Sequence, residues 1–424
     1  PIFPGIQLLG EEQTKINSKQ NNISNKKIVL QKLDKISELA DKEFEKSLFQ
    51  KSEEHILNAI KISKQNFGEK DIVTLNLIDK LAKIYAWQGR YKEAEYLFLN
   101  NIKIKKQIFG TQNFDYIASN RELGRIYDTL GRFKDAEKLY LKNIEIIDII
   151  YGSNHAFSIS QKVLLGNLYS KFYSHEKAIK VLSNACQIAK NYRKEYSFAD
   201  GSFYSICLDR LSKAYMKKGN YTKAESILKE SLEIDKNIYG QEEIEVGNKF
   251  YTLSQLYLSQ NNFSKAENSI LKSIKLTEQL YGNENILLAR RLDFLAAIYE
   301  WQNFNLKAEP LLLRSLKIAE KVYNKNHPSY AFYLGRLGVH YSDFNYSKDE
   351  VIYKKAENYL KRSYKIYKKK YGKEHPNSIK QLQRLGYFYL QKGLNNEIEE
   401  EKDYSLKLYA KAENLLKKVS KIAK

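Results

Sequence analysis

The sequence predicts an all-α fold, a solenoid of about nine stacked helix-turn-helix repeats. One observation is the pattern aromatic-x-x-Ala-Glu, exemplified by residues Tyr221 to Glu225, which recurs along the 424 residues. Another is its spacing, which is 42 residues in five of the eight steps and longer in the other three. A third is the scarcity of proline, with five in the whole chain, which suits long helices. The small residue of the pattern falls at Ser52, Ala94, Ala136, Ala178, Ala224, Ala266, Ala308, Ala356 and Ala412.

The first helix of each repeat is predicted from a second pattern, Leu-small-x-x-Tyr, as in Leu165, Gly166 and Tyr169. The Leu and the Tyr are four residues apart and therefore share one face of a helix. The small residue beside the Leu allows another helix to approach closely. In the first repeat Glu43 stands where the Tyr is expected, which fits an atypical terminal repeat.

The turn between the two helices carries glycine in some repeats and asparagine in others. Gly89, Gly131 and Gly219 occupy the place that Asn261 and Asn303 occupy elsewhere. Both residue types tolerate a positive φ, so we expect a left-handed residue at this turn.

The second helix is expected to begin at a capping box and to end at an aromatic-Gly pair. Thr222-x-x-Glu225 and Ser264-x-x-Glu267 have the capping-box pattern. Tyr281-Gly282 is one of the aromatic-Gly pairs, in which the glycine caps the helix. One repeat has Tyr323-Asn324 instead, and there we expect Asn324 to be left-handed.

The repeats organise the chain into a tail, residues 1–27, and a solenoid, residues 28–424. We expect the tail to be flexible or processed, since the chain begins with Pro1 and a longer protein is an alternative. Insertions are predicted in the third repeat near 196–201, in the seventh, where Ser347-x-x-Glu350 predicts an early second helix, and in the last around 395–403.

The net charge of +21 is concentrated near the end of the chain. Residues 351–424 hold 19 Lys and Arg against 8 Asp and Glu. Such a balance favours acidic protein partners, anionic membrane surfaces or nucleic acid, whereas the plainer interpretation is a Lys-rich solvated surface. No apolar run is long enough for a membrane span, and we expect a cytoplasmic protein.

The combined patterns resemble the tetratricopeptide repeats of the kinesin-light-chain type over about residues 28–424. The 42-residue period and Asn326-His327-Pro328 after the second helix carry this resemblance, as does Tyr371-Gly372 followed by His375-Pro376. The resemblance implies a right-handed superhelix whose concave surface, lined by the first helices, holds an extended or helical peptide. It implies a scaffold or adaptor within a larger assembly.

The residues that commonly carry chemistry show no catalytic or metal-binding pattern. His155, His327 and His375 recur in one kind of loop, so the repeat separates them along the solenoid and predicts structural turn residues. Cys186 and Cys207 form no metal-binding spacing, and Cys186 falls at a core position. We therefore predict no enzyme and no cofactor.

The groove residues are predicted by register, as positions two or five residues from each repeated Leu. The partner-binding candidates are Asn76, Arg121, Arg125, Asn167, Asn248, Tyr251, Arg290, Phe332, Val339 and Tyr387. These side chains make the groove polar early in the chain and more apolar towards its end. We expect a protein or peptide partner there.

A basic segment supplies the alternative to groove binding. Its candidate residues for an anionic partner are Lys361, Arg362, Lys365, Lys368, Lys369 and Lys370. In that alternative the protein associates with anionic membranes or nucleic acid through its C-terminal repeats. A third alternative is the sensor portion of a longer signalling protein.

Overall fold

The computed structural model describes residues 4–45, 48–171, 174–195, 201–343, 350–397 and 402–423, and it leaves out the side chains of residues 4–24 and of a few residues beside the gaps. Within these ranges all regular secondary structure is α-helical, as the repeat pattern predicts. No helix in the described ranges has the length and apolarity that crossing a membrane requires.

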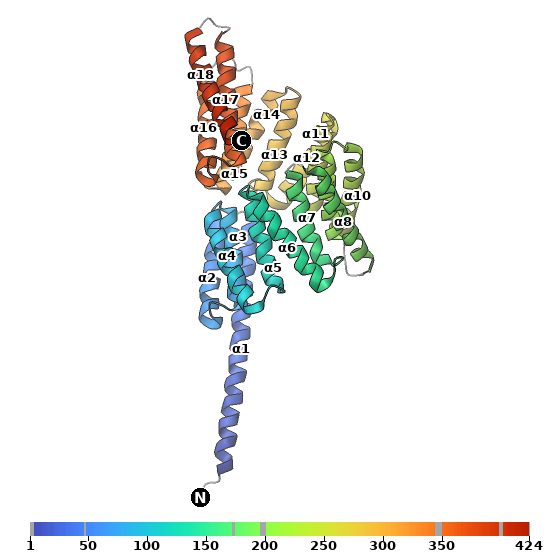
Figure 1. The fold of residues 1–424 in the computed structure, drawn as a ribbon, viewed down its shortest axis with the longest axis vertical. Helices are drawn as coiled ribbons and strands as arrows, with labels where there is room; N and C mark the ends of the chain where they lie inside the picture. The colour runs from blue at the N-terminus through green and yellow to red at the C-terminus, as the bar shows by residue number, and fades with distance from the viewer. Residues whose placement is uncertain are drawn as a thin grey trace. The chain divides into compact units, whose positions relative to one another are not determined.

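The eighteen helices of the described residues pair in chain order into nine repeats (Figure 1). The first helices are α1 (Pro4–Glu45), α3 (Ile72–Trp87), α5 (Phe114–Thr129), α7 (Ala156–Lys171), α9 (Ser202–Lys217), α11 (Ile244–Ser259), α13 (Ile286–Trp301), α15 (Pro328–Asp343) and α17 (Pro376–Glu397). The second helices are α2 (Phe49–Phe67), α4 (Tyr91–Phe109), α6 (Phe133–Tyr151), α8 (His175–Glu195), α10 (Tyr221–Tyr239), α12 (Phe263–Tyr281), α14 (Asn305–Val322), α16 (Glu350–Tyr371) and α18 (Lys402–Ala423). The predicted all-α solenoid of about nine helix pairs is confirmed.

The chain divides into two compact parts, residues 1–122 and residues 123–424. In the second part each helix from α6 to α18 packs against the next one along the chain. In addition α7 contacts α9, α9 contacts α11, and α15 contacts α17. Side-chain hydrogen bonds join α13 to α11 and α15 to α13. The first helices from α7 to α17 therefore lie beside one another and form one surface, which we call the first-helix face.

The core depends on small residues where the two helices of a repeat cross. The seven alanines of the pattern from Ala94 to Ala356 are fully buried, and Ser52 and Ala412 are nearly so. The small residue of the first helix is equally constrained, because a Cβ on Gly166 would lie 2.5 Å from Leu182 Cγ. The predicted close approach of the helices is confirmed at this contact.

The two repeated patterns are joined by a hydrogen bond between neighbouring repeats. The Tyr of a first helix donates its hydroxyl to the Glu that lies 32 residues earlier, in the Ala-Glu pair of the preceding second helix. Tyr299 bonds Glu267 at 2.8 Å and Tyr341 bonds Glu309 at 2.7 Å. Tyr169, Tyr257 and Tyr389 bond Glu137, Glu225 and Glu357 in the same way.

The turn prediction is confirmed, and the prediction for Asn324 is wrong. Asn261 and Asn303 have φ of 57° and 61°, and they are the non-glycine residues with positive φ in the described chain. At the end of a second helix, however, Gly240 combines a φ of 94° with a ψ of 173°, a region essentially restricted to glycine. Asn324 cannot adopt this glycine conformation, so α14 ends at Val322 and the backbone of Tyr323 is extended.

The predicted capping boxes are also wrong. Helices α10 and α12 begin at Tyr221 and Phe263, before the Thr and Ser of the expected boxes. Their N-caps are Asn220 and Asn262, whose side chains accept from the backbone N–H of Lys223 and Lys265. The Glu of each predicted box instead accepts a hydrogen bond from the tyrosine hydroxyl of the next repeat.

Helix α1 covers residues 4–45, so helical backbone extends through most of the predicted tail. The flexibility or processing of that tail stays a prediction. The insertions fall between α8 and α9, between α15 and α16, and between α17 and α18. Counted from α1–α2, these positions belong to the fourth, eighth and ninth helix pairs. Residues 196–200, 344–349 and 398–401, including Ser347, lie outside the described residues.

Substituting two helical glycines should have opposite effects on stability. In Gly166→Ala the new methyl group collides with Leu182, and such overpacking costs about 1–3 kcal/mol of the free energy of unfolding. In Gly247→Ala the nearest atom is 3.5 Å from the new Cβ, so the methyl group fits. Alanine forms helices better than glycine and should add up to about 1 kcal/mol to the free energy of unfolding. Urea denaturation of both variants measures the difference, and a loss of equal size in both would contradict the close-approach account.

Candidate binding site

A cavity of about 390 Å³ opens on the first-helix face of the second part. We call it the tyrosine cavity, because five of its twelve lining residues are tyrosines. Its walls come from α11, α13, α15, α16 and α17, together with Tyr323 after α14. The lining residues are Tyr251, Ile286, Arg290, Asp293, Tyr323, Pro328, Ser329, Phe332, Tyr333, Tyr367, Tyr371 and Asn377.

Three of the groove residues predicted by register meet in this cavity. Tyr251, Arg290 and Phe332 come from three successive first helices and line the same space. Arg290 and Phe332 are 42 residues apart, so they hold equivalent positions on α13 and α15. Phe332 is 36% exposed although it is a large apolar residue, and its ring lies 5.1 Å from that of Tyr333.

The acidic group of the cavity is already neutralised by its own chain. Arg336 donates to Asp293 and to Glu300 at 2.7 Å each, and Glu300 Oε1 lies 2.9 Å from Nδ1 of buried His340. Burial raises the pKa of Asp293, although the charge of Arg336 opposes this. Burial would also raise the pKa of Glu300, but the bond with His340 and the charge of Arg336 hold it below its ordinary value.

Arg290 supplies the cation of the cavity. Its side chain is exposed, and in the part of the chain that the structure describes no carboxylate forms an ion pair with it. The adjacent Arg291 is different, because it is buried and donates to Ser273 and Asn248. Burial raises the pKa of Tyr251 and of Tyr333, so these hydroxyls remain neutral hydrogen-bonding groups.

The other predicted groove residues lie outside the tyrosine cavity. In the first part, Asn76 accepts from buried Lys105, and Arg121 pairs with Glu122. In the second part, Val339 packs against the hydrophobic core, and the hydroxyl of Tyr387 accepts from Gln383. The remaining ones are Arg125, exposed on α5, Asn167, half-buried on α7, and Asn248, exposed on α11.

Sequence reasoning missed the half of the cavity that comes from helix ends. Tyr371 and Tyr323 were identified only as the aromatic residues that close second helices, and Tyr367 and Asn377 were not predicted as binding residues. The pattern contained a signal, because the aromatic-Gly pair directly precedes the next first helix and must therefore lie beside it.

The loop between α16 and α17 is held from both sides by His375. Its ring stacks on Tyr371 at 4.2 Å, and its Nδ1 accepts from the backbone N–H of Asn377 at 3.1 Å. Its Nε2–H donates at 3.0 Å to the carbonyl of Thr129 at the end of α5, 246 residues earlier. Tyr371 at the end of α16 and Asn377 at the start of α17 flank this loop and line the cavity, so the contact with Thr129 also fixes the cavity wall.

The same histidine position caps helices elsewhere in the chain. Nδ1 of His155 and of His327 accepts the N–H two residues later, at 3.2 and 2.9 Å. Asn285 does the same for Leu287 with its amide oxygen. The prediction of structural turn residues therefore agrees with the geometry. Within the described ranges no group of three or more His, Cys, Asp or Glu is placed to hold a metal ion.

The predicted basic residues lie along α16. Lys361 pairs with Glu357 at 2.5 Å, and the guanidinium of Arg362 lies 5.9 Å from the ring of Tyr330. Lys368, Lys369 and Lys370 occupy the last turn of α16, and Lys365 is exposed one turn earlier. Cations in the last turn of a helix interact favourably with its dipole, which gives these lysines a structural role.

Family comparison matches two models described as tetratricopeptide repeat. One matches residues 72–148 and 204–279, and the other matches residues 288–329 and 353–377. Together they cover more than half of the chain. No curated protein matches it.

Several solved structures are similar in fold. A Rap protein complexed with competence and sporulation factor is 12% identical with a TM-score of 0.54, over 93% of this chain and 99% of that one. The apo quorum sensor NprR from B. thuringiensis is 14% identical with a TM-score of 0.53, over 91% and 99%. A putative kinesin light chain from Podosopora anserina is 20% identical with a TM-score of 0.40, over 49% and 97%.

The burial of His375 should make stability depend on pH. Burial lowers the pKa of His375, although the bond to Thr129 opposes this, so the folded protein binds this proton less readily than the unfolded chain. In the unfolded chain the pKa of histidine is about 6.5. The contribution of His375 to stability is therefore complete above that pH, and it falls as the pH drops below it. His375→Asn keeps an N-cap residue but cannot titrate, so it should lose less stability between pH 7 and pH 5. Urea midpoints at both pH values test this, and identical losses would refute it.

Proposed function

We propose that this chain, which belongs to the tetratricopeptide repeat family, is a non-enzymatic scaffold that binds a segment of a partner protein on its first-helix face. The observation that carries the proposal is the tyrosine cavity, in which side chains from successive first helices converge. Its volume falls within the usual range of ligand-binding pockets. An extended or helical segment crossing α11, α13 and α15 would place one side chain in this cavity.

The lining residues support a bound group with two chemical features. Phe332 and the tyrosine rings offer apolar area with hydroxyl groups at its edge, which suits an apolar anchor residue. Arg290 offers a cation beside that anchor, which suits an acidic side chain or a terminal carboxylate of the partner. The partner segment is therefore expected to combine an apolar residue with a neighbouring negative charge.

The state of the titratable groups supports binding over catalysis. Asp293 is engaged by Arg336, and burial raises the pKa of Tyr251 and of Tyr333, so none of these three groups is a ready base. General acid–base catalysis needs a group whose pKa lies near the working pH and which can reach a reacting atom.

The basic segment of α16 remains the alternative interaction surface. We prefer the cavity because Lys361 is paired with Glu357 and the lysines of the last turn complement the helix dipole. The sensor alternative rests on likeness of fold alone.

Binding of selected peptides tests the cavity. A displayed library of random 12-residue peptides is selected on the immobilised full chain, and the enriched peptides are measured by fluorescence polarisation. Phe332→Ala and Arg290→Glu should each weaken binding at least tenfold, because one removes the apolar wall and the other reverses the charge.

The matched control is Lys317→Glu, which makes a similar charge reversal at an exposed position of α14, outside the cavity. It should bind like the wild type. If no peptide is enriched, or if all three variants bind like the wild type, the proposal is wrong. Salt-sensitive binding to anionic vesicles or nucleic acid, lost when Lys368, Lys369 and Lys370 are replaced by Glu, would favour the alternative.

A further inference from the structure

The turn between α13 and α14 reverses an order of residues that four other repeats share. Helices α4, α6, α10 and α12 each have a polar N-cap residue that is followed by an aromatic first residue. At α12 these residues are Asn262 and Phe263, whereas α14 has Phe304 at the N-cap and Asn305 as its first residue. The aromatic side chain has therefore moved from the helix into the turn.

This reversal weakens the start of α14. Asn262 caps α12 by accepting from the backbone N–H of Lys265, and Phe304 has no side-chain atom that can do the same. The amide oxygen of Asn305 is buried and has no hydrogen-bond partner in the described structure. Such an atom destabilises the fold. A sequence that breaks its own local pattern at a cost to stability indicates a function at that place.

Three large apolar side chains are exposed within residues 301–306. Trp301 is 67% exposed, Phe304 47% and Leu306 81%, which is the highest value among the large apolar side chains that the structure describes. The two preceding repeats have Thr222 and Ser264 at the position of Leu306. We call Trp301, Phe304 and Leu306 the apolar tip.

The two tryptophans of the chain hold the same repeat position but have different surroundings. In the first part, the ring of Trp87 lies 5.6 Å from that of Phe44 and 6.1 Å from that of Phe49. No aromatic ring packs against Trp301 in the described part of the chain. Trp301 is therefore available to a partner, and Trp87 is a natural control for it.

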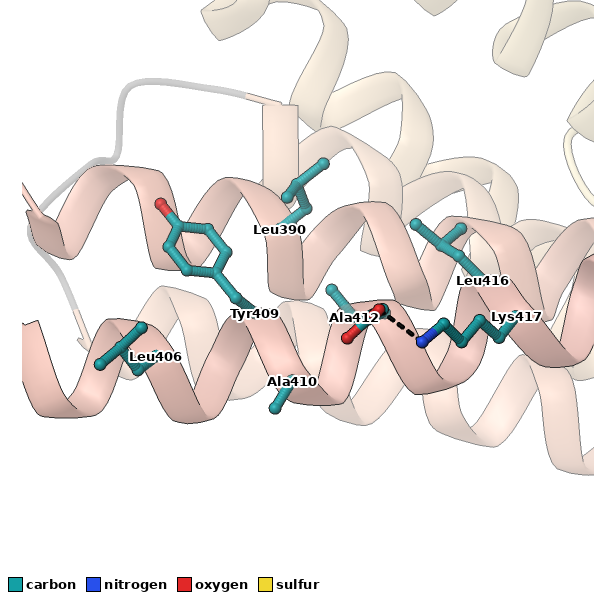
Figure 2. A pocket seen from close by; sticks show the side chains of 8 residues that line it. Leu390, Leu406, Tyr409, Ala410, Ala412, Leu416 and Lys417 are labelled. Carbon is teal, nitrogen blue, oxygen red and sulfur yellow. Dashed lines mark ion pairs between the residues drawn. The ribbon is translucent and has the colours of Figure 1, made fainter.

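The apolar tip is not a hollow like the apolar pocket on α17 and α18 (Figure 2). That pocket of about 690 Å³ is lined by Leu390, Leu406 and Leu416, and the Lys417 at its border pairs with Glu413. The side chains of the apolar tip line neither this pocket nor the tyrosine cavity, and they are exposed at a turn. A protruding tip needs a hollow in another protein or the soft interface of a lipid bilayer.

A row of lysines accompanies the apolar tip. In five successive second helices the residue before the buried alanine of the pattern is an exposed lysine. Among the described residues no carboxylate pairs with any of these five side chains. We call them the lysine row, which consists of Lys177, Lys223, Lys265, Lys307 and Lys355.

The lysine row and the apolar tip lie along one edge of the second part. The bond from Tyr299 to Glu267 places the end of α13 beside the start of α12, and the other tyrosine-to-glutamate bonds do the same for their helices. Nζ of Lys307 lies 5.6 Å from the ring of Tyr299 and 5.0 Å from that of Phe304. A cation of the row is therefore next to the apolar tip.

We infer that this edge docks on an anionic lipid bilayer, with the apolar tip inserted among the lipid headgroups. Aromatic side chains favour that interface, and its negative charge attracts the lysine row. A protein partner would need a hollow for the tip and a line of negative charge in register with the lysines. A bilayer offers both everywhere on its surface. The tyrosine cavity is lined from near the opposite ends of α13 and α15, so docking leaves it open.

The two tryptophans provide the direct test. In Trp87→Phe the remaining tryptophan is Trp301. The full chain is mixed with phosphatidylcholine vesicles that contain or lack phosphatidylserine. With phosphatidylserine, the emission of Trp301 should shift to shorter wavelength and should be quenched by brominated lipids, because the indole leaves water. In Trp301→Phe the emission of Trp87 should not change.

Flotation with the same vesicles measures what each group contributes. Leu306→Asp should weaken vesicle binding at least tenfold, and Lys265→Glu combined with Lys307→Glu should weaken it severalfold at low salt. Leu271→Asp, at an exposed position in the middle of α12, should bind like the wild type. These positions are exposed, so their substitution should preserve the fold, as circular dichroism can verify.

A further variant, Phe304→Asn combined with Asn305→Phe, restores the order of α12. It should raise the urea midpoint, because it supplies the cap and removes the unpaired amide, and it should weaken vesicle binding severalfold. A lower urea midpoint would contradict the cost on which the inference rests.

Three results would overturn the inference. One is an emission of Trp301 that vesicles with phosphatidylserine do not shift, and another is vesicle binding that Leu306→Asp does not change. The third is self-association in sedimentation that Leu306→Asp abolishes, which would assign the apolar tip to a second copy of the chain.

Discussion

The contact between a small residue of the first helix and a large residue of the second helix determines the geometry of every repeat. Gly124 lies against Tyr140, Gly166 against Leu182, and Gly338 against Leu360, with no room for a further methyl group. Because this contact recurs with the period of the sequence, each repeat offers the same faces to its neighbours. The tyrosine-to-glutamate bond then joins successive repeats.

Packing the helices of the solenoid against one another also brings polar residues of their faces together. Buried charges are tolerated when they are paired and hydrogen-bonded. In the first part Lys105 contacts Asp79 at 2.7 Å, and in the second part Lys249 lies 3.4 Å from Asp235. Arg336 performs this role for Asp293. Most of the polar residues that register places on the first-helix face are therefore used by the protein itself. Arg290 is an exception among the described residues, and this makes the tyrosine cavity the best candidate for a partner.

The fold was predictable from sequence because its determinants are local and periodic. The 42-residue period placed the helix pairs, and the interchange of Gly and Asn identified the left-handed turn at Asn261. Local reasoning failed where two patterns compete for one residue. Glu225 fitted the pattern of a capping box, but it accepts a hydrogen bond from Tyr257 of the next repeat. Asn220 caps the helix instead. Asn324 was expected to imitate glycine, yet the conformation that ends helices such as α10 is one that only glycine adopts readily, and α14 ends at Val322 instead.

The candidate site was predictable only in part. The repeat register alone predicted that Tyr251, Arg290 and Phe332 share one surface, because equivalent positions of successive repeats lie side by side. Register could not show that Val339 packs against the core or that Asn248 accepts from Arg291, since both depend on contacts between repeats. The contact of His375 with Thr129 joins residues 246 positions apart, and no local pattern predicts it.

Photo-cross-linking from within the cavity tests the central claim most directly. The full chain carrying p-benzoylphenylalanine in place of Phe332 is irradiated in extracts of its native source, beside a chain that carries the same group in place of Leu313 on α14. The account predicts a single protein cross-linked at position 332 but not at position 313, through a segment that contains an apolar residue next to an acidic one. Equal cross-linking at both positions, or cross-linking at position 313 alone, would contradict a binding site on the first-helix face.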